Sequence, residues 1–200
     1  MVNARIYIEG GGESKDLHVE CRKGFRLLLE ACGFAGRMPR LIACGSRSAA
    51  YDDFCTEHAA AKPGTYVAMI VDSEDPVADI EQTWSHLRGR DGWAKPRGAD
   101  DEQVLLMVTC METWIVADRA TLRRHYKSGF QESALPTLAN MESRTRSSIQ
   151  DGLVRATRNC TEKYAKGAES FRIVALLDPA ELRKHLPSFV RFERVLNEKL

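Results

Sequence analysis

The chain has 200 residues, a length that suits one domain or one domain with a small appendage. Hydrophobic residues make up 44% of it, enough for a sizeable core, and the formal net charge of +1 argues against a globally basic nucleic-acid binder. No apolar run approaches the roughly 20 residues of a membrane-spanning helix. The N-terminus also lacks the basic and long apolar segments of a signal peptide. We therefore expect a cytoplasmic protein with no membrane partner.

The cysteines point to a reducing compartment. None of the six forms a CxxC pair, and most lie in apolar, periodic segments. We expect them to be buried free thiols, and the short ligand spacings of a zinc site are missing. They are Cys21, Cys32, Cys44, Cys55, Cys110 and Cys160.

The first half of the chain alternates strand-like apolar runs with helix-like segments. Such alternation predicts crossover connections and a mostly parallel sheet with flanking helices, which is an α/β fold. The residues at 66–71 are continuously apolar, as expected of a strand that is covered on both faces. Ser14 is the expected N-cap of the first helix. In chain order we predict strand 4–9, helix 15–32, strand 39–44, helix 47–61, strand 66–71, helix 77–88, a polar loop over 89–98 and strand 103–109.

The strand signal fades after about residue 112. We predict an α/β core over residues 1–118 and a mainly helical C-terminal extension over 119–200 that packs on it, together one compact domain. The later segments are predicted to be helical or mixed over 112–127, 147–166, 169–177, 179–185 and 187–198.

Acidic residues stand at or near the ends of three predicted strands. Glu9 and Glu13 flank a run of three glycines after the first strand, Asp72 and Glu74 follow the third, and Glu112 follows the fourth. Ligands of open α/β sheets bind beyond the carboxyl ends of the strands, so we expect these acids to converge at one edge. Asp72 and Glu74 are two apart, which on an extended backbone places both on the same side.

Clustered carboxylates repel one another unless a cation sits among them. Oxygen-only ligands favour Mg²⁺ or Mn²⁺ over Zn²⁺, and such an ion can polarise a phosphodiester and orient water. The plainer alternative is that these are solvated acids at strand ends, where Asp, Glu and Gly are common.

Several motifs make the chain similar to a known group of proteins. They are Ile8-Glu9-Gly10-Gly11-Gly12-Glu13, Val71-Asp72-Ser73-Glu74-Asp75, the segment from Met111 to Asp118, and Lys163-Tyr164-Ala165-Lys166. The first two resemble the Toprim fold of topoisomerases, bacterial primases and overcoming-lysogenization-defect nucleases. More closely, the chain resembles domain-of-unknown-function family 4276, a Toprim-like group of small prokaryotic proteins. The second motif reads Asp-x-Glu where the Toprim pattern has Asp-x-Asp, and Gly12 stands where the first motif has Thr.

The resemblance implies a Toprim-like core and a nuclease that uses Mg²⁺ or Mn²⁺. Glu9, Asp72 and Glu74 would be catalytic metal ligands, and Glu13 or Glu112 would hold a second metal or take a proton from water. Lys163 or Lys166 would neutralise charge on the phosphate. The same resemblance implies a partner ATPase and a role in defence against phage or mobile DNA.

A separate set of residues suggests contact with nucleic acid. Arg47 follows a strand and can hold a phosphate through two hydrogen bonds. Arg90, Trp93, Lys95 and Arg97 form a basic loop with one aromatic residue, a combination that binds single strands by charge and stacking. Surface arginine and an ordinary surface loop are the alternatives.

The leading hypothesis is therefore a metal-dependent nuclease acting on DNA or RNA. The main alternative is a non-catalytic Toprim-like subunit docked on an ATPase, and a third is a phosphotransferase or phosphatase acting on small molecules. The third lacks an Asp-x-Asp-x-Thr motif, which would supply a nucleophilic Asp.

Overall fold

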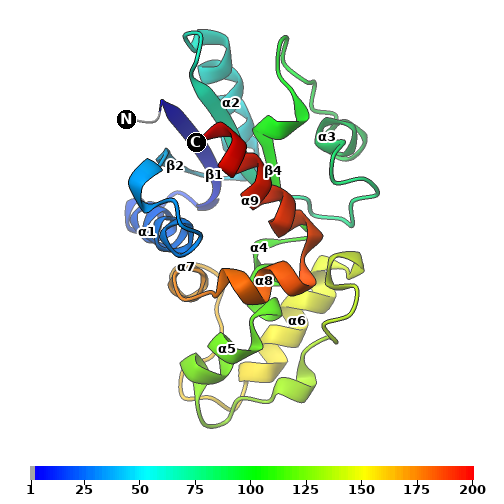
Figure 1. The fold of residues 1–200 in the computed structure, drawn as a ribbon. Coiled ribbons are helices and arrows are strands. Elements are labelled where there is room, and N and C mark those ends of the chain that lie inside the picture. The colour runs from blue at the N-terminus through cyan, green and yellow to red at the C-terminus, as the bar shows by residue number, and fades with distance from the viewer. Residues whose placement is uncertain (1–2) are drawn as a thin grey trace.

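A four-stranded parallel sheet forms the centre of one half of the molecule (Figure 1). The computed structural model describes residues 3–200. Every neighbouring pair of strands is parallel, which confirms the predicted α/β class. The strand order is β2-β1-β3-β4, with β1 at Ala4–Gly11, β2 at Arg40–Gly45, β3 at Tyr66–Asp72 and β4 at Val104–Met107.

Helices surround this sheet and continue beyond its carboxyl edge. The α-helices of residues 3–200 are α1 (Lys15–Ala31), α2 (Arg47–Ala60), α3 (Thr83–Asp91), α4 (Met111–Ala117), α5 (Arg119–Tyr126), α6 (Arg146–Thr157), α7 (Ala168–Val174), α8 (Pro179–His185) and α9 (Pro187–Lys199). Short 3-10 turns lie at Ala35–Arg37, Asp101–Gln103, Glu132–Ala134 and Met141–Ser143.

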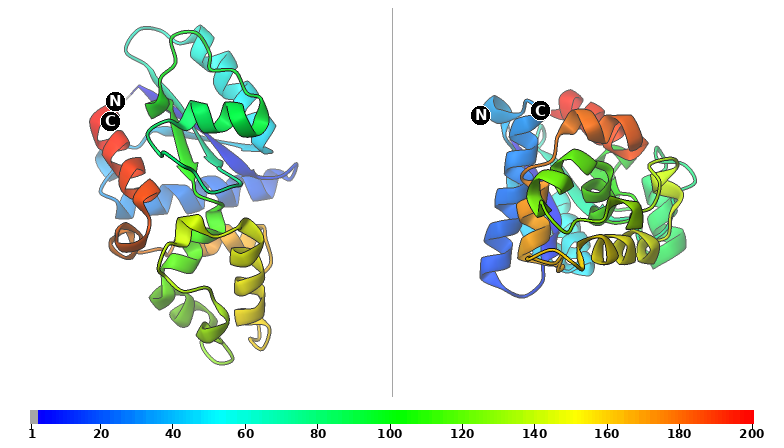
Figure 2. Two further views of the ribbon diagram at one scale, coloured as in Figure 1. Left: turned by 90° about the vertical axis from the view of Figure 1, so that its right-hand side faces the viewer. Right: turned by 90° about the horizontal axis from the view of Figure 1, so that it is seen from below.

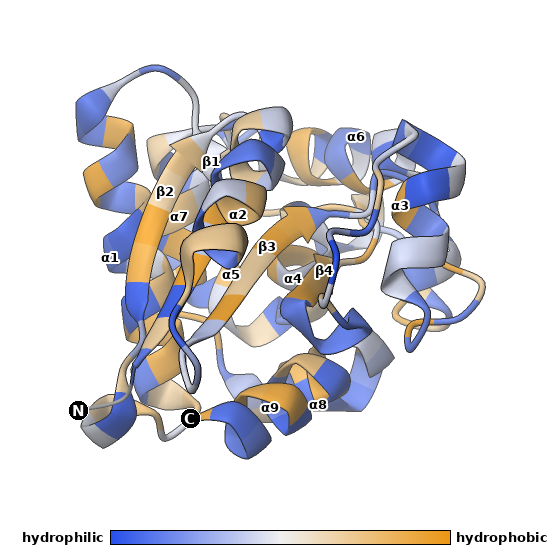
Figure 3. Ribbon diagram, turned by 90° about the horizontal axis from the view of Figure 1, so that it is seen from above, coloured by the Kyte–Doolittle hydropathy of each residue, from blue (hydrophilic) through white to orange (hydrophobic). Residues whose placement is uncertain are grey.

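The strands send alternate side chains into two apolar layers. Ile6, Ile8 and Ile70 belong to a large cluster with residues of α1, α4, α7 and α9. Tyr7 and Met69 belong to a second cluster on the other face, with residues of α2 and α3. Because both faces are covered, the strands are largely apolar, and Figure 3 shows them mainly orange between helices that carry both colours.

The C-terminal helices pack on the sheet half. Figures 1 and 2 show α4 to α8 beyond the sheet's carboxyl edge, while α9 returns to run beside β4. The large apolar cluster extends without a break from Ile6 in β1 to Leu196 in α9. The predicted helical C-terminal part is therefore present and shares its core with the sheet. The division of the chain at residue 118 stays a prediction.

The first two helices both begin at serine caps, of which the sequence predicts Ser14. The Ser14 hydroxyl accepts a hydrogen bond from the backbone N–H of Leu17 at the start of α1. Ser46 caps α2 in the same way through the N–H of Ala49. Both helices end within a residue of the predicted bounds, Ala31 and Ala60 against 32 and 61.

Three predicted helices have different bounds in the structure. The helix expected over 77–88 is α3, Thr83–Asp91, because the Asp79 side chain folds the preceding segment by accepting from the backbone N–H of Glu81. It also runs into the segment predicted as a loop and ends at Gly92, whose φ of 71° is left-handed.

The segments expected over 112–127 and 147–166 are both shorter as helices. The first is divided at Asp118, whose carboxylate caps α5 and also accepts from the backbone N–H of Asp178. The second ends at Thr157, whose hydroxyl accepts from the backbone N–H of Tyr164 and holds the chain in an irregular return. Side chains that bond to the backbone in this way compete with helix propagation.

All six cysteines are free, as predicted, although only Cys21, Cys110 and Cys160 are fully buried and the others are half-buried. Across residues 3–200, no helix combines the length and the apolar character needed to cross a membrane.

Candidate metal centre at the carboxyl edge of the sheet

Acidic side chains tie together the carboxyl ends of the neighbouring strands β1, β3 and β4. The Glu9 carboxylate accepts a hydrogen bond from the backbone N–H of Asp72 at 2.9 Å. Asp72 Oδ1 accepts one from the backbone N–H of Met111, at the start of α4, at 2.7 Å. Glu9, Asp72 and Glu74 each offer an oxygen atom, and these atoms lie within 4.8 Å of one another. The three acids thus form one cluster.

Glu74 reaches this cluster by a route that differs from the predicted one. The strand ends at Asp72, and Glu74 has a left-handed backbone with φ of 68°. This conformation is uncommon for a residue with a side chain. The backbone N–H of Glu74 donates to the carbonyl of Thr109 at 2.8 Å, which holds the turn against the segment after β4. A turn, and not an extended backbone, therefore places Glu74 beside Asp72.

Burial and mutual repulsion make the two inner acids resist ionisation. Asp72 is buried, and burial raises its pKa well above its usual range, with the Glu9 and Glu112 carboxylates adding to the rise. Burial also raises the pKa of Glu9, although the N–H of Asp72 and the Arg47 guanidinium oppose that rise. A positive charge among these oxygens would relieve both effects.

The donor set fits a hard divalent cation. All three side chains present carboxylate oxygens, which suit Mg²⁺ or Mn²⁺ better than Zn²⁺. Within residues 3–200, no group donates a hydrogen bond to Asp72 Oδ2, so this oxygen of a buried carboxylate is available as a ligand. The acids, their spacing and their electrostatics therefore define a potential divalent metal site.

Two arginines approach Glu74 from different helices. Arg146, the first residue of α6, forms an ion pair with Glu74 Oε2. Arg90 in α3 has its Nη2 atom 3.7 Å from the same oxygen. Arg90 also binds Asp75 through Nε at 3.0 Å and Asp91 through Nη1 at 2.6 Å. Asp75 itself has a side chain that is mostly exposed, so it belongs to the turn rim.

A third arginine braces the backbone of the cluster. Arg47 Nε donates to the carbonyl of Asp72 at 2.9 Å, and its Nη1 donates to Asp91 at 2.5 Å. The Arg47 guanidinium lies 4.4 Å from the ring centre of Trp93, and Tyr51 stacks on Trp93 at a centroid distance of 4.4 Å. The arginine and the tryptophan that we expected to face nucleic acid are thus engaged with one another inside the chain.

Glu112 forms a second, fully buried site next to the three acids. Its Oε1 atom accepts from the Tyr164 hydroxyl at 2.9 Å, and its Oε2 atom accepts from Gln150 Nε2 at 3.2 Å. Lys166 Nζ lies 3.7 Å from Oε1. Burial alone would raise the pKa of Glu112, but Lys166, Gln150 and Tyr164 together hold it below its usual range. Glu112 is therefore an ionised anchor for Lys166.

The glycine-rich turn after Glu9 forms one wall of a small pocket. Gly10, Gly11 and Gly12 all have positive φ, and Gly45 faces them, where an added Cβ would lie 2.2 Å from the carbonyl oxygen of Gly12. A cavity of about 170 Å³ opens there. Its lining includes Glu9, Asp72, Lys166, Met107, Met111 and Phe171. The cavity therefore brings Lys166 and two of the acids to one space.

The remaining candidates lie outside this cluster. Glu13 is exposed just before α1, and Lys163 is exposed in the irregular segment after α6. Lys95 and Arg97 are exposed, with Lys95 beside Trp84 and Arg88 at a separate surface hollow. The structure thus assembles Glu9, Asp72, Glu74, Glu112, Lys166, Arg47 and Arg90 near the edge of the sheet.

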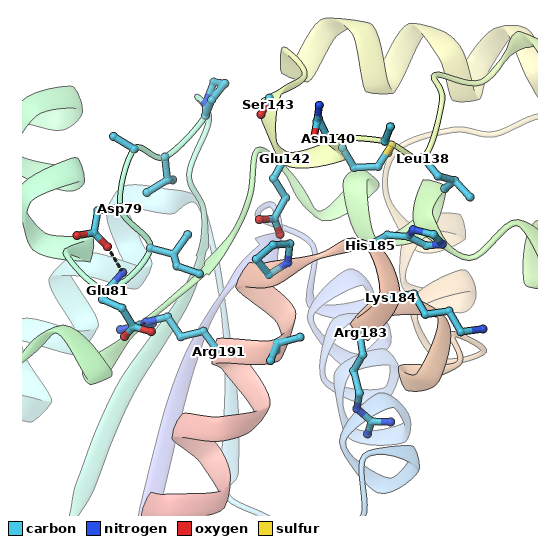
Figure 4. Close-up of a pocket in the computed structure, with 18 of the residues that line it drawn as sticks. Asp79, Glu81, Leu138, Asn140, Glu142, Ser143, Arg183, Lys184, His185 and Arg191 are labelled. Carbon is cyan, nitrogen blue, oxygen red and sulfur yellow. Dashed lines mark hydrogen bonds and ion pairs between the residues drawn. The ribbon is translucent and has the colours of Figure 1, made fainter.

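A larger cleft of about 1110 Å³ lies between the segment at 76–81, the segment at 138–143 and helices α8 and α9 (Figure 4). Its charged groups mostly serve intramolecular contacts. Glu142 accepts from the N–H and hydroxyl of Ser188 at the start of α9, and Arg191 binds Glu81 and two backbone carbonyls. The acids of this cleft do not converge as those at the sheet edge do, so the sheet edge is the better candidate site.

The fold and the acidic cluster define an α/β protein with a potential metal site at the carboxyl edge of a parallel sheet. The chain matches the family model described as a domain of unknown function (DUF4276) over residues 8–197. It therefore belongs to that family, as its motifs suggested. No curated protein and no solved structure gives a significant match.

Sequence reasoning missed four residues that shape the site. Arg146, Gln150 and Tyr164 come from the C-terminal half, and Asp91 bridges Arg47 and Arg90. Tyr164 stood inside a quoted motif, which was a usable signal. Arg146 and Gln150 carry no local signal, because only the packing of α6 against α4 brings them to the sheet edge.

Proposed function

We propose that the protein is a metal-dependent nuclease of Toprim type, hydrolysing phosphodiesters in DNA or RNA with Mg²⁺ or Mn²⁺. The observation that carries the proposal is the cluster of Glu9, Asp72 and Glu74 oxygens within 4.8 Å. A bound divalent ion would supply Lewis-acid polarisation of a phosphodiester and of water. The motifs that resemble Toprim enzymes, Ile8 to Glu13 and Val71 to Asp75, support the same chemistry.

The residues around the cluster have complementary tasks in this proposal. Glu9, Asp72 and Glu74 would hold the ion, with Asp72 fixed by Met111 and Glu9 fixed by the N–H of Asp72. Lys166 would offset the negative charge that develops on the phosphate, since Lys166 lines the same cavity as Glu9 and Asp72.

Glu112 would act through Lys166 as a positioning residue. Its carboxylate is fully buried and bound by Tyr164 and Gln150, and it holds Lys166 at 3.7 Å. Both Glu112 oxygens thus have polar partners inside the chain, which suits an anchor for Lys166. We therefore assign no second-metal role to Glu112, and Glu13 is exposed outside the cluster.

We further propose that the protein is an effector in a prokaryotic defence system and works with an ATPase. This part rests on the resemblance to Toprim-like proteins alone. A non-catalytic subunit of an ATPase complex is the second candidate, and one observation favours it. Glu74 pairs with Arg146 and lies near Arg90, so one of the three acids already has a counter-charge without an ion.

A cleavage assay separates the two candidates. Purified protein is incubated with plasmid, linear DNA and RNA in Mg²⁺ or Mn²⁺, beside Glu9→Ala and Asp72→Ala. The matched control is Asp151→Ala, because Asp151 is an exposed acid on α6. The nuclease predicts cleavage by the wild type and the control and none by the two site variants. Cleavage that survives both site substitutions contradicts the site, and metal binding without cleavage, even with an ATPase added, favours the subunit.

A further inference from the structure

Glu74 is the sole ion-pair partner of Arg146 among residues 3–200, whereas the nearby Arg90 and Arg47 have several partners. Its guanidinium pairs with Glu74 Oε2, and among residues 3–200 it makes no other side-chain hydrogen bond or ion pair. Its side chain is about one-third exposed, at 32%, so it borders solvent at the mouth of the cluster. Arg146 therefore has one anionic partner, and that partner is a proposed metal ligand.

Arg90 and Arg47 are held in other ways. Arg90 binds Asp75 and Asp91 in addition to its approach to Glu74. Arg47 binds the Asp72 carbonyl and Asp91 and lies over the ring of Trp93. If the Glu74 carboxylate binds a cation, both of these arginines keep their other hydrogen-bond partners and stay in place. Arg146 alone loses its partner.

A divalent ion and the Arg146 guanidinium compete for the same carboxylate. Both are positive, and an ion held by Glu74 and Asp72 would stand close to the guanidinium that pairs with Glu74 Oε2. Binding of the ion would therefore repel the guanidinium and remove its counter-charge. A guanidinium without a counter-charge at a half-open site is well suited to bind a phosphate through two hydrogen bonds.

We propose that Arg146 is a substrate-binding residue which pairs with Glu74 in the metal-free protein and is released by the divalent ion to bind the phosphate of the nucleic acid. This inference rests on the proposed function, because it assumes the ion and a phosphodiester. It predicts that the metal ion binds before the nucleic acid, because the ion releases the arginine that binds the phosphate. It also explains how the stable Glu74–Arg146 pair can belong to an active site.

The proposal requires opposite effects of one substitution on two ligands. Arg146→Gln removes the cation that competes for Glu74, so Mn²⁺ should bind about two- to fivefold more tightly, the range expected for a partly exposed ion pair. The same variant loses the phosphate contact, so short DNA or RNA should bind about tenfold more weakly in Ca²⁺. A merely structural role for Arg146 would not tighten the binding of the metal.

The experiment uses the full chain and two measurements. Calorimetry with Mn²⁺ gives the metal affinity, and fluorescence anisotropy with labelled single-stranded DNA and, separately, RNA in Ca²⁺ gives the nucleic-acid affinity. The variants are Arg146→Gln, Arg146→Lys and Arg155→Gln, the last an exposed arginine on the same helix. We expect both affinities of Arg146→Lys to lie between those of Arg146→Gln and the wild type, because lysine keeps the positive charge. We expect Arg155→Gln to match the wild type.

The outcomes are distinguishable from failure of the proposed function. If the wild type binds Mn²⁺ and nucleic acid but Arg146→Gln leaves either affinity unchanged, the role of Arg146 is overturned and the metal site stands. If the wild type binds no Mn²⁺, or binds no nucleic acid in Ca²⁺, the proposed function is overturned together with this inference.

Discussion

Replacing Asp72 by asparagine tests the electrostatic strain of the metal-free cluster. The Asp72→Asn side chain has nearly the same shape, and its amide oxygen can still accept from the backbone N–H of Met111. The substitution removes one negative charge from a buried group that lies within 4.8 Å of the ligand oxygens of Glu9 and Glu74. We therefore expect the variant to be more stable than the wild type when no divalent ion is present.

The separation of the oxygens sets the size of the effect. Two unit charges 4.8 Å apart at an effective dielectric constant of about 20 repel by about 3.5 kcal/mol. The raised pKa of Asp72, caused chiefly by burial, and the nearby Arg47 guanidinium both make the gain in stability smaller than this repulsion. We therefore expect a gain of about 1–3 kcal/mol, or about 2–4 °C in Tm for each kcal/mol.

The effect has a definite dependence on pH. The folded-state pKa of Asp72 is raised, chiefly by burial. The unfolded chain loses this proton near pH 3.9, about the ordinary pKa of Asp, whereas the folded protein keeps it to a higher pH. This contribution is fully present below the unfolded pKa and is lost as the pH rises through the folded pKa. The wild type should therefore fall behind Asp72→Asn as the pH increases.

Thermal denaturation in EDTA at a series of pH values measures this difference. The exposed-acid variant Asp151→Asn is the control and should follow the wild type. Addition of Mn²⁺ should stabilise the wild type more than Asp72→Asn, because the variant binds the ion more weakly. An Asp72→Asn protein that is less stable than the wild type at neutral pH in EDTA, or a difference that does not grow with pH, would refute the reasoning.

Three further substitutions test the supports of the site. Gly45→Ala should lower the stability by more than about 2 kcal/mol in urea denaturation, because its φ is 80° and the new Cβ would meet the Gly12 carbonyl oxygen at 2.2 Å. Glu112→Gln should cost about 1–3 kcal/mol in the same assay, because it replaces a buried acceptor of two hydrogen bonds. Arg47→Lys should lower the stability by about 1–2 kcal/mol and change the fluorescence of Trp93, because lysine lacks the planar fork that joins two acceptors and covers the ring.

Each of these has a surface control. Gly36→Ala adds a Cβ that meets nothing within 4 Å, while Glu162→Gln and Arg155→Lys change exposed side chains. Stability losses no larger than those of the matched controls would contradict the account of the three supports.

Local patterns were sufficient to predict the sheet half of the fold. Strands β3 and β4 are almost wholly apolar because helices cover both faces of the sheet, and Ser14 caps α1 through a short-range bond that the sequence predicted. The bounds of α3 and α6 were not predictable in the same way. They depend on bonds from Asp79 and Thr157 side chains to the backbone, which a pattern of apolar residues does not show.

The site was predictable in part for a similar reason. Glu9 and Asp72 lie near the carboxyl ends of the neighbouring parallel strands β1 and β3, so the topology brings them together. Glu74 joins them through a left-handed turn, and the arginine that pairs with it, Arg146, is 72 positions away in the sequence. Contacts of that range arise from the packing of α6 on α4, for which the sequence offers no local pattern.

Binding of Mn²⁺ to the purified protein, followed by calorimetry and by electron paramagnetic resonance, tests the central claim most directly. We predict that the wild type and Asp151→Asn bind Mn²⁺ with oxygen ligands, and that Asp72→Asn binds it at least about tenfold more weakly, since the deleted charge belongs to a buried ligand. Equal Mn²⁺ affinity in the wild type and Asp72→Asn, or no binding by either, would contradict the assignment of Glu9, Asp72 and Glu74 as a metal centre.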